Sequence, residues 1–203
     1  MGLTRSSVSN GAIDCSLEIK KKNLNDKIIA LAGNPNVGKS TVFNNLTNMN
    51  QHTGNWPGKT IVSAQGYLKS KNHSYVLVDI PGTYSLMSHS QEEEVARNFI
   101  CFSKPDTVVV VCDATCLERN LNLVLQIMEI TSNVIVCVNL MDEAKRKNIT
   151  IDIDLLSRKL GVPVVATTAR NKKSLDMLVK TIDDTVEDNC IKNSYKILYN
   201  DTI

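Results

Sequence analysis

The chain has 203 residues, and its 23 Lys and Arg against 21 Asp and Glu give a net charge of +2, which offers no electrostatic case for binding nucleic acid or an acidic membrane surface. Hydrophobic residues make up 42% of the chain, which is enough to bury one core and excludes disorder for its bulk. The six cysteines are too few for a disulfide scaffold, and no apolar run reaches the roughly 18 residues of a transmembrane helix. We therefore expect a soluble domain from a reducing compartment.

The beginning of the chain differs in composition from the rest. Residues 1–25 are rich in Ser, Asn and Lys and lack the apolar segment of a secretory signal, so we interpret them as a flexible tail. Gly2 and Ser6 fit the short, degenerate pattern for N-myristoylation, which alone is a weak indication.

From residue 27 onward, short apolar runs rich in β-branched residues alternate with amphipathic stretches. Continuous apolar runs are typical of strands buried on both faces of a parallel sheet. The alternation predicts an α/β fold with a mostly parallel central sheet and helices on both faces. Strands are expected at residues 28–33, 59–67, 75–80, 107–114, 133–140 and 162–169, and helices at 39–47, 92–102, 118–131, 154–160 and 174–187.

The most specific motif is GNPNVGKS, residues 33–40, between a predicted strand and a predicted helix. It matches the phosphate-binding pattern G-x-x-x-x-G-K-[ST]. Gly33 and Gly38 allow backbone N–H groups to converge on phosphate oxygens. Lys39 supplies a cation to the terminal phosphates, and the Ser40 hydroxyl can ligate Mg²⁺. A glycine-rich turn without a ligand is the alternative, which the strand and helix around it disfavour.

The second motif, DIPG at residues 79–82, also follows a predicted strand, at the edge where open α/β sheets bind ligands. It matches a nucleotide switch, in which Asp79 holds Mg²⁺ through water and the Gly82 N–H senses the γ-phosphate. The loop from His52 to Thr60 precedes it, and Thr60 is the candidate switch threonine that ligates Mg²⁺ only when the γ-phosphate is present.

The third motif, NLMD at residues 139–142, points to guanine. The Asp142 carboxylate can accept two hydrogen bonds that guanine donates and adenine lacks. Taken alone, the motif is better interpreted as a plain helix cap. At the end of the last predicted strand, Thr168 and Ala169 can present a backbone N–H to the guanine oxygen. Four motifs in this order indicate a GTP-binding domain, and Asn139 with Asp142 disfavours a P-loop enzyme for another nucleotide.

Trp56 is the only tryptophan, and glycines and a proline flank it. We predict that it is exposed on a mobile loop. The alternative is that it anchors this loop as a hydrophobic side chain.

The segments GNPNVGKSTVFNNLT, TGNWPGKT, DIPGTYSL, SQEEEVARNFI and DATCLERNL together resemble the N-terminal G domain of the ferrous iron transport protein B (FeoB) family, over about residues 27–185. The resemblance implies the P-loop GTPase fold and a GTP-hydrolysing switch domain of a Fe²⁺ transporter. It also implies Mg²⁺ held by Ser40, Thr60 and Asp79, and catalytic roles for Lys39, Thr60 and Asn36. The candidate nucleotide-binding residues are Gly33, Asn34, Pro35, Asn36, Val37, Gly38, Lys39, Ser40, Thr41, Gly58, Lys59, Thr60, Ile61, Val62, Asp79, Ile80, Pro81, Gly82, Asn139, Leu140, Met141, Asp142, Thr168 and Ala169.

Three positions bear on the rate and affinity. Asn36 resembles the asparagine that helps to hold K⁺ beside the phosphates in potassium-activated family members, where carbonyls corresponding to residues 54–56 complete the site. A cation there would neutralise transition-state charge. Thr83 stands where Ras-type enzymes have a water-orienting glutamine, so slow hydrolysis is expected. Leu140 replaces the usual lysine of N-K-x-D, so modest affinity is expected.

The resemblance implies parts beyond this chain. Residues 26–188 are the expected G domain, and residues 189–203 are interpreted as the truncated start of a helical regulatory domain. A membrane domain of the same full-length protein would follow, which implies a place on the cytoplasmic face of the inner membrane. Oligomers could form through the full-length protein. No nucleic-acid partner is expected. The alternative is a stand-alone regulatory GTPase that acts through a protein or ribosomal partner, and the downstream reading frame distinguishes the two.

The remaining chemistry-bearing residues are predicted to be structural. Cys112 and Cys116 have the i, i+4 spacing of a metal pair, but we expect them, with Cys101 and Cys137, to be small buried hydrophobic residues. The acidic run 92–94 is expected to form the first turn of a helix. The three histidines, His52, His73 and His89, are scattered and are interpreted as solvated loop residues.

Overall fold

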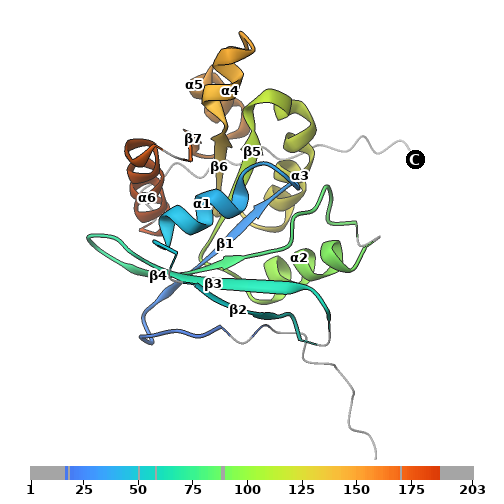
Figure 1. Ribbon diagram of the computed structural model, residues 1–203, viewed down its shortest axis with the longest axis vertical. Helices are drawn as coiled ribbons and strands as arrows, with labels where there is room; N and C mark the ends of the chain where they lie inside the picture. The colour runs from blue at the N-terminus through green and yellow to red at the C-terminus, as the bar shows by residue number, and fades with distance from the viewer. Residues whose placement is uncertain are drawn as a thin grey trace, which may run out of the picture.

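The computed structural model describes residue 17 and residues 19–49, 51–57, 59–87, 90–169 and 171–187. A seven-stranded sheet in the order β2-β3-β4-β1-β5-β6-β7 runs through it, with helices on both faces (Figure 1). The strands are β1 (Lys27–Gly33), β2 (Gln51–Asn55), β3 (Val62–Lys69), β4 (Ser74–Asp79), β5 (Thr107–Asp113), β6 (Val134–Asn139) and β7 (Val164–Ala166). The helices are α1 (Lys39–Leu46), α2 (Gln91–Phe102), the short 3₁₀ helix η1 (Ala114–Cys116), α3 (Leu117–Ile130), α4 (Met141–Arg146), α5 (Ile153–Leu160) and α6 (Lys172–Val186).

The predicted mostly parallel sheet is confirmed. Strands β4, β1, β5, β6 and β7 pair with one another in parallel, whereas β2–β3 and β3–β4 pair in antiparallel fashion. The sequence did not predict β2 or α4. Strand β2 is polar and pairs with β3 alone, and α4 has six residues, so neither shows an apolar period. The strand expected at 162–169 is shorter, at 164–166.

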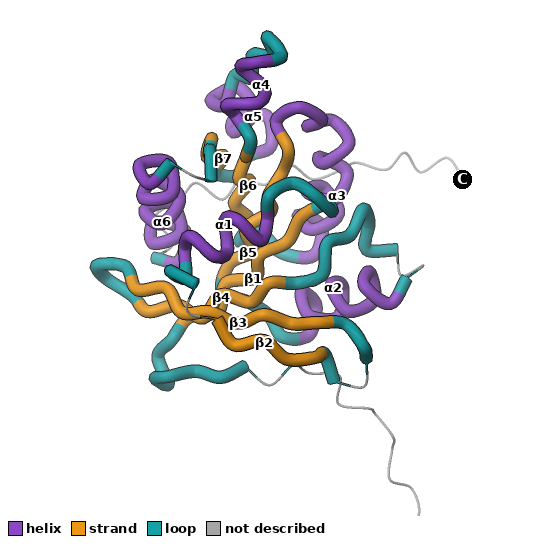
Figure 2. Tube along the Cα trace, viewed as in Figure 1, coloured by secondary structure: helices purple, strands orange, loops and turns teal. Residues whose placement is uncertain are grey.

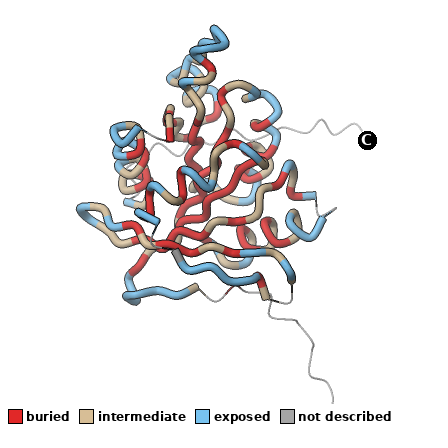
Figure 3. The backbone as a smooth tube through the Cα atoms, viewed as in Figure 1, coloured by how far each residue is buried: buried red, intermediate tan, exposed pale blue. Residues whose placement is uncertain are grey.

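Alternation along the strands divides the core into two layers. Successive side chains of a strand point to opposite faces of the sheet. In β1, Ala30 and Ala32 pack in the layer with α2, α3 and α5, whereas Ile29 and Leu31 pack in the layer with α1 and α6. Figure 3 shows the central strands buried throughout, with exposed residues concentrated on the peripheral helices and loops. Burial on both faces explains why these strands are continuous apolar runs.

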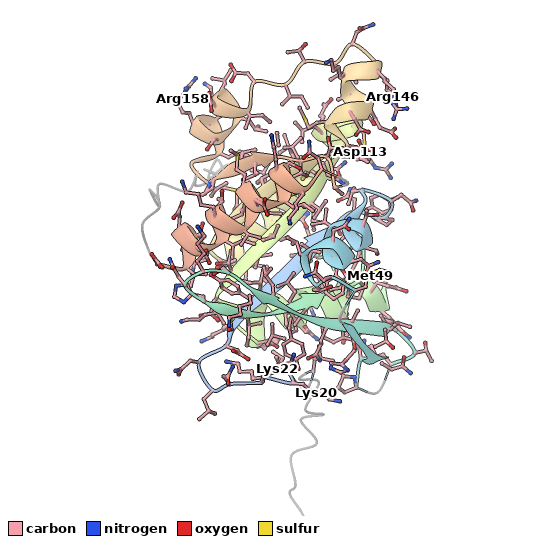
Figure 4. The ribbon with its side chains drawn as sticks, turned by 60° about the vertical axis from the view of Figure 1, so that its left-hand side comes forward. Lys20, Lys22, Met49, Asp113, Arg146 and Arg158 are labelled. Carbon is pink, nitrogen blue, oxygen red and sulfur yellow. The ribbon has the colours of Figure 1, made fainter. Side chains whose placement is uncertain are left out.

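The segment before β1 lies against β3. The Lys20 N–H donates to Gln65 Oε1 at 3.0 Å, and the Tyr67 hydroxyl donates to the Lys20 carbonyl at 2.7 Å. Lys22 Nζ lies 3.8 Å from the centre of the Tyr67 ring. Figure 4 shows Lys20 and Lys22 on the side of the molecule where β2 and β3 run. Lys20 and Lys22, which belong to the expected flexible tail, are therefore held against β3.

The structure does not test the other expectations about the two ends of the chain. The first sixteen residues, with Gly2 and Ser6, lie outside the described residues, and so do residues 189–203. Across the described part of the chain, no helix is long and apolar enough to cross a membrane.

Candidate functional site

The sequence motifs meet at one edge of the sheet. Strands β1, β4, β5 and β6 run parallel, so the loops after them leave at the same end (Figure 2). Gly33 ends β1, Asp79 ends β4 and Asn139 ends β6. Figure 4 shows Asp113, at the end of β5, and Arg146 of α4 at the same end of the molecule. This is the edge at which open α/β sheets bind ligands.

The glycines of the loop between β1 and α1 are required by close approach. A Cβ on Gly33 would lie 2.5 Å from the carbonyl oxygen of Val111 in the neighbouring strand. A Cβ on Gly38 would lie 2.5 Å from Asn139 Nδ2, and Gly38 also has a left-handed backbone with φ of 81°. The loop can therefore sit tightly on β5 and β6 only with glycine at both positions.

This loop borders a cleft of about 490 Å³. Helix α1 begins at Lys39, so the free N–H groups of its first turn face the cleft and favour an anion. The cleft is lined by Asn34, Pro35, Asn36, Gly38, Lys39, Ser40, Thr41 and Gly82. The side chain of Val37 is 2% exposed and that of Ile80 is 1% exposed, so both belong to the core and only their backbones are available to a ligand.

The cation and the switch carboxylate of the cleft are in contact. Lys39 Nζ forms an ion pair with Asp79 Oδ1. Burial raises the pKa of the Asp79 carboxyl, and the charge and hydrogen bond of Lys39 act in the opposite direction. The Ser40 hydroxyl and the Asp79 carboxylate are hard oxygen donors of the kind that Mg²⁺ prefers, so the donor set fits this ion.

The second switch, which is the loop at residues 79–85, lies directly on the phosphate loop at residues 33–40. A Cβ on Gly82 would be 3.3 Å from the backbone nitrogen of Pro35. The Thr83 N–H donates to the Gly33 carbonyl at 3.2 Å, and the Thr83 side chain is buried. A buried threonine thus stands where a water-orienting glutamine would be expected.

Asn139 connects three loops at the other end of the cleft. Its side chain is fully buried, and its Nδ2 donates to the Val37 carbonyl at 3.0 Å. Its Oδ1 accepts from the Ala169 N–H at 3.1 Å and from the Thr167 hydroxyl at 3.2 Å. The Ala169 N–H that the sequence assigns to a guanine oxygen is therefore already engaged, and a ligand would have to share it.

A smaller pocket of about 140 Å³ adjoins Asn139 and is lined by Gly38, Thr41, Asn139, Leu140, Asp142, Glu143, Arg146, Thr168 and Ala169. Leu140 has a left-handed backbone with φ of 61°, which places it against the phosphate loop at Gly38. The side chain of Asp142 is half-exposed at this pocket, 3.8 Å from Arg146 Nη2. Sequence reasoning missed Arg146 and Thr167. The i, i+4 spacing of Asp142 and Arg146 was a usable signal, whereas nothing in the sequence singles out Thr167.

The first switch, which is the loop that contains Thr60, does not line the cleft. Thr60 is exposed, Ile61 is half-buried, and Val62 begins β3 with its side chain exposed. Gly58 lies outside the described residues. Trp56 is 3% exposed and packs edge-to-face on Phe99 of α2, with ring centres 5.4 Å apart. The prediction of an exposed Trp56 is wrong, because α2 supplies an apolar surface that covers the ring.

The cysteines form no metal site among the described residues, where no group of three or more His, Cys, Asp or Glu could hold an ion. Cys112 and Cys137 are buried and Cys101 is half-buried, but Cys116 is exposed, so the expectation of burial is wrong for Cys116. It follows β5 in η1, beyond the covered strand. Burial raises the pKa of the Cys137 thiol to about 12, which keeps it protonated.

The two histidines that the structure describes, His52 and His73, do not meet at the cleft. His52 is exposed on β2, and His73 Nε2 lies 3.0 Å from Glu187 Oε1 at the end of α6. His89 is outside the described residues.

The sequence profile described as "Ferrous iron transport protein B" matches residues 27–182. The chain belongs to this family. The Fe(2+) transporter FeoB of Escherichia coli (strain K12) is 42% identical over 159 residues, which are 76% of this chain and 21% of that protein. The chain thus spans about a fifth of the length of the curated FeoB relatives that it matches.

Solved FeoB structures share the fold. The FeoB G domain of T. maritima is 38% identical with a TM-score of 0.74, over 78% of this chain and 98% of that one. The FeoB G domain of Methanococcus jannaschii is 44% identical with a TM-score of 0.71, over 81% and 100%. The cytosolic domain of T. maritima FeoB in a GDP form is 36% identical with a TM-score of 0.82, over 86% and 69%. The predicted P-loop GTPase fold is confirmed.

Proposed function

We propose that the chain binds GTP with Mg²⁺, hydrolyses it slowly, and is the switch domain of a membrane transporter for ferrous iron. The observation that carries the GTP assignment is Asn139, which ties the phosphate loop to the loops after β6 and β7 and so places Asp142 beside a formed pocket. Family membership supports this transporter reading over a stand-alone GTPase with a ribosomal partner.

We assign phosphate, Mg²⁺ and guanine binding to different residues of the cleft according to their positions. Lys39 and the first turn of α1 bind the terminal phosphates, and the Gly82 N–H meets the γ-phosphate. Ser40, Asp79 and Thr60 would hold Mg²⁺, which when bound neutralises charge on the phosphate oxygens. Asp142 accepts the hydrogen bonds that distinguish guanine from adenine. If adenine were bound instead, the Asp142 carboxylate would lose these two hydrogen bonds.

Slow hydrolysis and potassium stimulation are the finer parts of the proposal. The buried Thr83 carries no amide with which to orient water. Asn36 is exposed at the rim of the cleft with a left-handed backbone, so its side-chain oxygen is available to a K⁺ ion beside the phosphates. Such a cation would stabilise the charge that develops in the transition state.

The decisive experiment is GTP turnover in potassium and in sodium buffer, measured as phosphate release. We expect potassium to accelerate turnover by about tenfold or more, since a positioned charge is worth at least that in a transition state. Asn36→Ala should abolish the difference. Asn122→Ala, which removes an exposed asparagine from α3, should retain it. Equal rates in the two buffers would exclude the potassium role, and binding of GTP without turnover would exclude hydrolysis.

Further proposals concern parts of the protein beyond this chain. A helical regulatory domain and a membrane domain of the same protein would be the partners of this domain. The domain would lie at the cytoplasmic face of the membrane, and the full-length protein would mediate assembly. A membrane-spanning region in the downstream reading frame is the expected observation, and its absence would favour the stand-alone GTPase.

A further inference from the structure

The first-switch turn, residues 56–57 and 59–61 between β2 and β3, is closed by its own backbone. The Trp56 N–H donates to the Ile61 carbonyl at 2.8 Å, and the Lys59 N–H donates to the Trp56 carbonyl at 3.0 Å. These two hydrogen bonds join both sides of the turn, and Thr60 lies within it.

Two side chains dock this turn on α2. The Trp56 ring packs on Phe99, as described above. Lys59 Nζ lies 2.5 Å from Glu94 Oε2, and the Lys59 side chain is only 17% exposed. The hydrogen bond from Lys59 and its charge lower the pKa of Glu94, so this carboxylate is ionised at neutral pH. One contact is apolar and the other is ionic, and both hold the turn to the same helix.

Docking keeps Thr60 apart from the phosphates. Figure 1 shows the turn beside α2 and away from the loop between β1 and α1. The Thr60 hydroxyl would have to approach Ser40 in order to share a Mg²⁺ ion with it. Because the turn is closed by its own hydrogen bonds, this approach breaks the contacts of Trp56 and Lys59 with α2.

The first turn of α2, which contains Glu94, also contacts the second switch. Ser90 caps the helix by accepting a hydrogen bond from the Glu93 N–H, and the Ser85 hydroxyl donates to Glu93 Oε1 at 3.2 Å. Glu94, which binds the first switch, is the next residue. The first turn of α2 therefore contacts both switches through adjacent glutamates.

From these contacts we infer that Lys59 and Glu94 are positioning residues for GTP hydrolysis, whose ion pair holds the first-switch turn on α2 and so opposes the presentation of Thr60 to Mg²⁺. The inference rests on the proposed GTPase function and adds the residues that set how readily the switch closes. Neither residue needs to contact the nucleotide for this role.

Two opposed effects act on the docked position of Trp56. Burial of the Trp56 ring against Phe99 stabilises it. However, the Trp56 Nε1–H is buried and has no protein partner among the described residues, which offsets part of this gain. With these two effects opposed, a single ion pair can shift the balance measurably.

Glu94→Gln tests the inference, because it removes the charge and keeps the shape. Exposed or half-exposed ion pairs change equilibria by about two- to fivefold, so we expect kcat for GTP and the preference for a non-hydrolysable GTP analogue over GDP each to rise by about that factor. Glu92→Gln is the matched control, since it removes a carboxylate from the same helical turn at an exposed position. Glu92→Gln should leave both quantities unchanged. High salt should bring the wild type toward Glu94→Gln by screening the pair.

Trp56 fluorescence supplies an independent readout, because it is the only tryptophan. Its emission should shift to longer wavelength with the GTP analogue and Mg²⁺, and not with GDP, as the ring leaves α2. If Glu94→Gln behaves like Glu92→Gln, or if the emission is the same in both nucleotides while GTP is still hydrolysed, the inference is overturned and the GTPase proposal stands. A wild-type protein that neither binds nor hydrolyses GTP overturns the GTPase proposal itself.

Discussion

The two ends of the nucleotide cleft are built differently. At the end that we propose to bind guanine, called the guanine end below, a fully buried Asn139 joins three loops through hydrogen bonds of 3.0 to 3.2 Å. At the switch end, Thr60 is exposed and its turn is docked on α2 through Trp56 and Lys59. Under the proposed function, the first end is already arranged for a ligand, whereas the second would have to rearrange to meet one.

The difference follows from the strands that carry each end. The guanine loops follow β6 and β7, in the parallel part of the sheet, and every residue of β6 is buried. The first-switch turn joins β2 and β3 at the antiparallel edge, where residues 52–55 are exposed. Loops fixed by a buried ladder remain in place, and a turn at an edge can exchange one set of contacts for another.

The largest effect is expected at the guanine end. Asp142→Asn replaces an acceptor of two hydrogen bonds with a group that also donates, so GDP affinity should fall by about 100- to 1000-fold, and affinity for xanthosine diphosphate should rise. Equilibrium titration of both nucleotides is the measurement. Asp154→Asn removes an exposed carboxylate of α5 and should change neither strongly. Unaltered GDP binding in Asp142→Asn would contradict the guanine assignment.

Asn139→Ala should show that the guanine end also contributes to the stability of the fold. The substitution leaves the buried Val37 carbonyl and Ala169 N–H without partners, so the free energy of unfolding should fall by about 2–4 kcal/mol. Urea denaturation without nucleotide measures it. Asn122→Ala, at an exposed position, should stay within about 0.5 kcal/mol of wild type. A loss for Asn139→Ala as small as this control would mean that the two loops are held by other contacts.

The smallest effect is expected from Leu140→Lys. The lysine stem keeps the apolar cover of the pocket and adds a charge near the ligand, so GTP and GDP should both bind about two- to fivefold more tightly. The ratio of the two affinities should not move, because the guanine end does not respond to the γ-phosphate. Leu155→Lys makes the same replacement at an exposed position of α5 and controls for added charge. A changed GTP to GDP ratio would show that the two ends are coupled.

Much of the framework was predictable because its signals are local. Apolar runs marked β1, β4, β5 and β6, and the motif glycines stand where the backbone approaches β5 and β6 most closely. Strand β2 and helix α4 were missed because neither carries an apolar period. The error at Trp56 arose because its neighbours in the sequence are turn residues, whereas its cover comes from Phe99.

The sequence alone determined the order of the motifs and, through continuous apolar strands, the parallel sheet that brings them to one edge. Periodicity and motif spacing are properties of short segments, so they survive without knowledge of the fold. The tertiary structure alone decided that Lys59 pairs with Glu94 and that Asn139 engages the Ala169 N–H. Those contacts join residues far apart in the chain, and only the packing of α2 and of the β7 loop against their neighbours brings them within hydrogen-bond distance.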